Sequence, residues 1–353
     1  MESAVDSVQN RPVCRWLHTA NLVIAMTSVV TVSDGLLTTS SIRAQEQPHT
    51  VTLVSRPTKS ETPWDKRVRL TRSGKVLSFD SSRLVMELPD GERKGFNSSL
   101  VAALDFQWAT EEARAAIRLC DTQKYRQAIP ALEKAYPELP LWQQKLMLGR
   151  LVGSLSAIGE DRIAGIIFLN ATKGDLPAFV YSDAPLSWTP KQPLARHAAE
   201  AQKWLRGETE YEQLLGASWL LTGSNRSDAA AVLGKLKASS DPAVAALATA
   251  QTWRLSTPPE TLEQLAQWIS FRDKLSLPLQ LGPTHFLADR SARVGQTDIA
   301  VAQWLRIASL YPERHFHATQ ALDSAEQQLR NLQRTQEAQS VAEWKQQFDQ
   351  TDP

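Results

Sequence analysis

The chain has 353 residues, and its 39 lysines and arginines almost balance its 38 aspartates and glutamates, giving a formal net charge of +1. Hydrophobic residues make up 42% and charged residues 22% of the sequence, proportions that exclude a largely disordered chain. So small a net charge excludes a strong overall field for nucleic acid or anionic membranes, and we expect no nucleic-acid partner. The length suits about two domains or one elongated repeat array.

Residues 1–44 have the features of an export signal. Arg11 and Arg15 precede an apolar stretch at residues 22–32, and Ala44 offers a small residue at which the signal would be cut. The apolar stretch is shorter than the roughly twenty residues that a spanning helix needs. We therefore predict an exported protein, periplasmic or secreted, with no integral membrane span in the mature chain. An uncleaved amino-terminal anchor is the alternative.

Removal of this signal would leave Cys120 as the single cysteine of the mature chain. A single cysteine forms no intramolecular disulfide, so helix packing must supply the stability. We expect Cys120 to be a small buried hydrophobic residue, with a reactive or intermolecular thiol as the alternative.

Two short regions precede the main body of the chain. Residues 45–66 are polar and contain three prolines, so we assign them to a linker. Residues 67–108 alternate apolar and polar side chains, a pattern that predicts a small β module of four or five short strands. About forty residues are marginal for an independent core, so this module should curl into an SH3-like barrel or lean on the following helices.

Turn-forming residues divide the predicted β module. Leu84, Met86 and Leu88 should lie on one face of a strand, and residues 101–108 form a last strand or a covering turn. The predicted turns lie at Ser73-Gly74, Asp80-Ser81-Ser82 and Pro89-Asp90-Gly91.

The sequence pattern of residues 109–350 predicts helices joined by short breaks. Helices joined in this way form helical hairpins. Thr110 supplies a capping hydroxyl for the first helix, and Glu111 follows in its first turn. Residues 181–193 contain three prolines and form the longest irregular segment, which we expect to be a loop that packs over a groove.

The segment at residues 125–140 is the most informative part of this helical region. It has the spacing of the second helix of a helical repeat of about 34 residues, with small residues where helices cross, larger ones that fill the groove and a closing proline. The residues in these positions are Tyr125, Ala128, Leu132, Ala135 and Pro140.

A related pattern returns downstream. Gly295 marks a turn, Ala300 a crossing position and Trp304 a packing position, and Pro312 ends the helix. Gly159 begins a poorer copy, four periods of about 34 residues before Gly295.

These two segments resemble degenerate tetratricopeptide repeats, and the order of the regions resembles exported bacterial repeat proteins with a small amino-terminal β module. The resemblance implies a mainly α fold: a TPR-like α-solenoid of stacked helical hairpins preceded by a small SH3-like module. It implies protein binding along a concave surface and transfers no catalytic residue or cofactor. A plain helical bundle, or a HEAT-like pair at residues 239–253, remains open.

We assign no catalytic, cofactor-binding or metal-binding residue. His315 and His317 form a His-x-His pair, but in a helix this spacing points the two side chains about 200° apart. Tyr181 and Trp188 are candidates for stacking on a sugar or peptide, although packing on neighbouring helices is the simpler interpretation. The basic residues Lys66, Arg67, Arg69, Arg72 and Lys75 more simply protect an exposed strand than bind an anionic partner.

The hypothesis that follows is a noncatalytic exported scaffold that binds a protein or peptide partner through its helical-repeat surface. One alternative is a helical enzyme acting on polysaccharide, which would need two carboxyl groups about 5 to 10 Å apart across an aromatic cleft. The other is a β module that binds cell-wall or peptide ligands while the helices act as a spacer.

Overall fold

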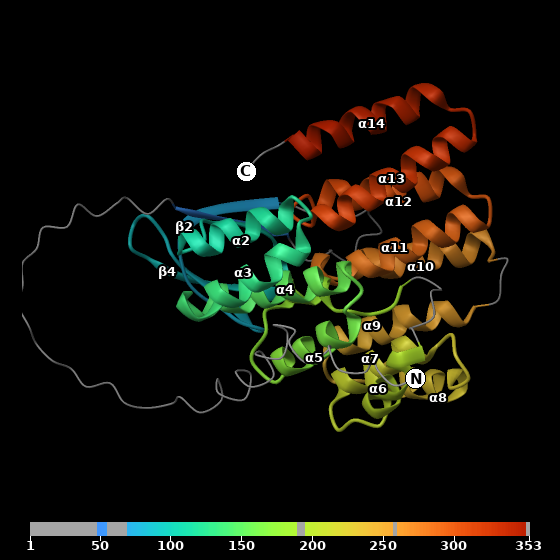
Figure 1. Ribbon diagram of the computed structural model, residues 1–353, viewed down its shortest axis with the longest axis horizontal. Helices are drawn as coiled ribbons and strands as arrows, with labels where there is room; N and C mark the ends of the chain where they lie inside the picture. Colours follow the sequence, from blue (N-terminus) through green and yellow to red (C-terminus); the bar gives the residue numbers. More distant parts are fainter. Residues whose placement is uncertain (1–47, 55–68, 189–194, 257–259, 351–353) are drawn as a thin grey trace, which may run out of the picture. The chain divides into compact units, whose positions relative to one another are not determined.

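The computed structural model describes residues 48–54, 69–188, 195–256 and 260–350 (Figure 1). The predicted export signal at residues 1–44, with its cut after Ala44, lies outside these residues. In the described part of the chain, no helix is both long and apolar enough to cross a membrane.

A 5-stranded antiparallel sheet stands near the amino terminus, in the order β4-β3-β2-β1-β5. Strand β2 is the longest and is shared, because its first half pairs with β1 and its second half with β3. The strands are β1 (His49–Val54), β2 (Arg69–Phe79), β3 (Arg83–Glu87), β4 (Arg93–Asn97) and β5 (Val101–Asp105).

Strand β1 corrects the sequence analysis, which assigned residues 45–66 to a linker. Val51 and Leu53 of β1 are buried, and the strand lies between β2 and β5. The alternation in this strand is short and follows a proline, and its pairing with β5 is far away in sequence. For these reasons its strand character does not stand out locally.

A second correction concerns Ser73 and Gly74, which form no turn but lie inside β2. A Cβ atom at Gly74 would lie 2.4 Å from the carbonyl oxygen of Glu87. The glycine is therefore required by the close approach of two chain segments, a common reason for glycine inside a strand.

The predicted strand with Leu84 and Met86 and the turns at Asp80 and Gly91 are confirmed. Leu84 and Met86 are fully buried, and the Asp80 carboxylate accepts hydrogen bonds from the backbone of the turn that follows it. Gly91 has a positive φ of 83° in the hairpin turn. The end of the module is strand β5, preceded by the short 3-10 helix η3 (Ser98–Leu100).

The rest of the described chain is mainly helical, as the sequence predicts. Most successive helices pack against each other, and Figure 1 shows α11 to α14 following one another in chain order. The helices are α2 (Glu111–Asp121), α3 (Tyr125–Ala135), α4 (Leu141–Ala157), α5 (Asp161–Thr172), α6 (Ala195–Leu205), α7 (Glu210–Leu220), α8 (Arg226–Leu236), α9 (Pro242–Thr252), α10 (Leu262–Lys274), α11 (Leu277–Arg293), α12 (Thr297–Leu310), α13 (His315–Asn331) and α14 (Thr335–Gln350).

Local signals explain where several helices begin and end. The Thr110 hydroxyl accepts a hydrogen bond from the Ala113 backbone, which caps α2 as predicted. Gly159 and Gly295 have φ values of 79° and 75° in the turns before α5 and α12. In this left-handed region a residue with a Cβ would cost about 1 kcal/mol or more.

The repeat-signature residues lie at helix contacts. Tyr125 is the first residue of α3 and is partly buried, Pro140 directly precedes α4, and Pro312 follows the end of α12. The fully or nearly fully buried members are Ala128, Leu132, Ala135, Ala300 and Trp304. The burial of these five side chains is a packing fact, while their role as a repeat signature and membership of the tetratricopeptide-repeat family stay predictions.

The proline-rich segment packs onto helices. Its 3-10 helix η5 (Ala178–Asp183) lies against α4 and α11. The ring of Tyr181 stacks on that of Tyr211 at 5.5 Å between centroids, and Trp188 lies so close to Gly282 that a Cβ there would be 2.0 Å from its Nε1 atom. Tyr181 and Trp188 therefore pack on neighbouring parts of the protein, which is the simpler of the two interpretations given for them. Residues 189–194 lie outside the described chain.

Helix α13 also contacts the first helices of the array. The rings of Tyr125 and Phe316 meet edge to face with centroids 6.0 Å apart. The Arg150 guanidinium donates to the backbone oxygen of Glu313 at 2.5 Å. In an open solenoid each repeat contacts only its neighbours, so these long-range contacts depart from that expectation.

Candidate functional site

A small polar cavity lies where α2, α3 and α4 meet η5 and α13. Its volume is about 40 Å³, enough for a few water molecules. The residues that line it are Cys120, Asp121, Tyr125, Arg150, Gly153, Ser154, Asp183, Arg314, His315, Phe316 and His317. We call this region the α13 junction.

A buried ion pair lies at the α13 junction. Arg314 Nη1 lies 2.8 Å from Asp183 Oδ2, and the two side chains are 6% and 5% exposed. Arg314 also donates to the Ser182 hydroxyl at 2.9 Å, and its guanidinium lies over the Phe179 ring, 5.2 Å from the centroid. Burial raises the pKa of Asp183, and the charges of Arg314 and Arg150 oppose that rise. The pair fixes the start of α13 onto η5.

A second carboxylate lines the same cavity. Asp121 at the end of α2 lies 3.7 Å from the Arg150 guanidinium of α4. Asp121 and Asp183 are thus each paired with an arginine. Paired carboxylates of this kind hold helices together, whereas a glycosidase would present its two carboxyl groups to an open cleft.

Two partly buried histidines contact each other beside the cavity. His317 Nδ1 of α13 lies 3.2 Å from His285 Nε2 of α11, with ring centroids 5.1 Å apart. Burial lowers the pKa of His285 to about 4. Burial, the neighbouring His285 and the charge of Arg314 lower the pKa of His317 well below its ordinary value. Both imidazoles are therefore neutral at pH 7.

Cys120 is buried, as the sequence analysis expects for a packed thiol. Its Sγ atom lies 3.4 Å from the Ser154 hydroxyl, and burial raises the pKa of the thiol. A thiol with a raised pKa is mostly protonated near neutral pH and is a poor nucleophile. Within the described residues, no group of three or more His, Cys, Asp or Glu side chains is arranged to hold a metal ion.

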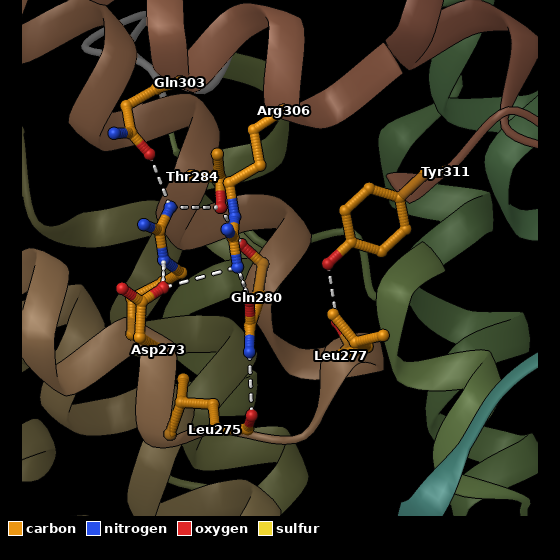
Figure 2. A network of polar contacts seen from close by, with 9 residues as sticks. Asp273, Leu275, Leu277, Gln280, Thr284, Gln303, Arg306 and Tyr311 are labelled. Atoms are coloured by element: carbon orange, nitrogen blue, oxygen red, sulfur yellow. Dashed lines mark hydrogen bonds and ion pairs between the residues drawn. The ribbon is translucent and has the colours of Figure 1, made fainter. Parts of the chain in front are cut away.

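A second buried polar network joins α10, α11 and α12, as Figure 2 shows. Arg272 is 1% exposed; it contacts Asp273 Oδ1 at 2.8 Å and donates to Thr284 and Gln303 at 3.0 and 2.6 Å. Burial lowers the pKa of Arg272, and the carboxylate of Asp273 opposes that effect. The guanidinium is thus satisfied by side chains from three helices.

Arg306 extends this network to a second guanidinium. It lies 3.3 Å from Asp273 Oδ1 and donates to Gln280 Oε1 at 2.8 Å. Gln280 in turn donates to the backbone oxygen of Leu275 at 2.8 Å. Asp273 therefore serves two buried arginines, one from α10 and one from α12 (Figure 2).

Among the repeat-signature residues, Tyr125 alone belongs to one of these two polar clusters, because it lines the cavity of the α13 junction. Trp304 and Ala300 belong to the apolar core of α11 to α14. Sequence reasoning missed Arg150, Asp183 and the two arginines of the second network. Their partners lie on other elements at no regular spacing, so no local motif marks them.

No protein-family model, curated protein or solved structure matches this chain. The resemblance to tetratricopeptide repeats therefore rests on the sequence pattern alone.

Proposed function

We propose that the chain is a noncatalytic exported scaffold that binds a protein or peptide partner through its helical-repeat surface. Helices packed largely in chain order, with small residues buried at the crossings, support this proposal. The buried polar groups support it as well, because at the α13 junction and in the network of Figure 2 they join helices to one another.

Three exposed leucines at helix ends are the apolar contact points that the proposal assigns to a partner. Leu141 begins α4 and Leu262 begins α10, and they are 66% and 57% exposed. Leu332 directly follows α13 and is 47% exposed. A partner that covered one of these side chains would gain roughly 25 cal/mol per Å² of apolar area removed from solvent.

The β module is proposed to be an SH3-like element attached to this scaffold. Strand β2 pairs with both β1 and β3, and the register of its pairing with β3 shifts between Val76 and Ser78. Both features support a sheet that bends on itself. Strand β1 between β2 and β5 supports the same topology.

A displayed peptide library tests the proposed binding. We expect the full chain to enrich a family of related peptides, and the variant Leu141→Ser/Leu262→Ser/Leu332→Ser to lose that enrichment. A matched control, Lys134→Ser/Gln267→Ser/Gln336→Ser, changes three exposed polar residues and should keep it. Equal enrichment by both variants, or no enriched family with the unmodified chain, would contradict the proposal.

A further inference from the structure

The α13 junction joins segments that are far apart in the sequence. Gln123, between α2 and α3, donates to the Thr319 hydroxyl of α13 at 3.5 Å. Together with the Tyr125–Phe316 ring contact and the Arg314–Asp183 ion pair, this bond attaches α13 to elements more than a hundred residues earlier.

The histidine pair is the pH-sensitive component of this junction. His285 of α11 and His317 of α13 are partly buried with two ring nitrogens 3.2 Å apart, an arrangement that needs one nitrogen to donate and the other to accept. Protonation of both rings turns both nitrogens into donors and places two cations side by side. The hydrogen bond between the rings is then replaced by repulsion.

The charges around the pair make added positive charge unfavourable. Arg314, at the start of α13, is a cation whose charge acts on His317. The carboxylate of Asp183 from η5 is already paired with Arg314, and Asp121 from α2 is paired with Arg150 from α4. The remaining titratable groups at the cavity, Cys120, Tyr125 and His315, supply no anion at neutral pH.

We propose that the α13 junction is a pH-sensitive clasp: the neutral His285–His317 pair holds the start of α13 against α11, and protonation of the pair in mild acid loosens α13 together with its contacts to α2, α3 and η5. Loosening of α13 exposes the cavity and frees one surface of α2 and α3. The lowered pKa values of both imidazoles agree with this direction, because the docked state disfavours the charged rings.

Cys120 offers a direct readout, since it lines the cavity and is buried when the clasp is closed. In the full chain carrying Cys14→Ser, it is the single thiol. A dipyridyl disulfide, which reacts with thiols in mild acid, measures its modification rate at pH 7.5 and pH 5.0. The rate of the urea-unfolded chain at each pH serves as the reference. We expect protection of Cys120 to fall about tenfold or more at pH 5.0, with the far-ultraviolet helical signal unchanged.

Two variants separate the clasp from a general effect of acid. His285→Asn/His317→Asn removes the titrating rings, and the protection of Cys120 should become independent of pH. Tyr125→Leu weakens the docking contact but keeps the histidines, so protection should fall at both pH values with the wild-type ratio between them. If the double variant does not fold, the single variant His285→Gln is measured in its place and should show a reduced ratio.

Three results would overturn the proposal. The first is equal protection of Cys120 in the unmodified junction at the two pH values. The second is a loss of protection that runs parallel with loss of the helical signal, because that means global acid unfolding. The third is a histidine variant that keeps the full wild-type pH ratio.

Discussion

The guanidinium of Arg314 lies 2.8 Å from the carboxylate of Asp183, and both side chains are almost completely buried. This ion pair connects α13 to a 3-10 helix more than a hundred residues earlier in the chain. An uncompensated buried charge is among the most destabilising changes that a substitution produces. The pair is therefore a sensitive point of the fold.

Substitution Asp183→Asn should lower the free energy of unfolding by about 3 to 5 kcal/mol, because it leaves the Arg314 charge buried without its carboxylate. Urea unfolding followed by circular dichroism measures this change. The matched control is Glu87→Gln, which removes the partner of Arg93 in a solvent-exposed pair and should change stability little. A loss for Asp183→Asn no larger than that of the control would contradict the prediction.

Substitutions in the network of Arg272, Arg306 and Asp273 (Figure 2) should lower the free energy of unfolding by unequal amounts. Asp273→Asn leaves two guanidiniums without their shared carboxylate, whereas Arg272→Met removes one cation and leaves Arg306 paired with Asp273. We expect Asp273→Asn to be the more destabilising substitution, by on the order of 1 kcal/mol or more. Chemical denaturation of the two variants side by side tests the order, and the reverse order would refute this account of the network.

Two glycines should respond to alanine in opposite directions. At Gly74 a Cβ would lie 2.4 Å from the Glu87 carbonyl oxygen, so Gly74→Ala must displace backbone and lowers stability by about 1 to 3 kcal/mol. Gly234 lies inside α8 with nothing within 4 Å of a Cβ, so Gly234→Ala should raise stability by about 0.5 to 1 kcal/mol. Thermal unfolding of both variants measures the two changes in stability. A stabilising effect of Gly74→Ala would contradict the strand assignment.

Folding stability should depend on pH through the histidine pair. The folded chain holds His285 with a pKa near 4, below the ordinary value of 6.5. Between these values the unfolded chain binds more protons, so the stabilising contribution is complete above about pH 6.5 and is lost as the pH falls toward 4. Urea midpoints at pH 7.5, 6.0 and 5.0 should fall in the wild type and fall less in His285→Asn. If the urea midpoints of the wild type and His285→Asn fell equally with pH, the histidine pair would be excluded as the cause.

The sequence predicted those parts of the fold that short-range patterns determine. The Thr110 cap, the Gly91 hairpin and the buried alanines of α3 follow from spacing and turn chemistry within a few residues. Strand β1 escaped prediction because its short alternation is supported by pairing with the distant β5. Gly74 was misassigned because the contact that requires a glycine is with Glu87, which no local pattern shows.

Fewer features of the candidate site than of the fold could be predicted from the sequence. Of the residues that line the cavity, only Tyr125 carried a repeat signature, and that signature concerned packing. His317 was considered only together with His315, whereas its contact is with His285 on another helix. Arg314 and Asp183 meet through tertiary structure alone, so their pairing has no periodic signal.

A double-mutant cycle between Arg314 and Asp183 tests most directly the central claim, that α13 is locked onto the earlier part of the array. The free energies of unfolding of the wild type, Arg314→Met, Asp183→Asn and the double variant would be measured at pH 7.5. We predict a coupling free energy on the order of 1 to 3 kcal/mol, with the double variant more stable than the sum of the single effects implies. Additive effects of the two substitutions would contradict the claim.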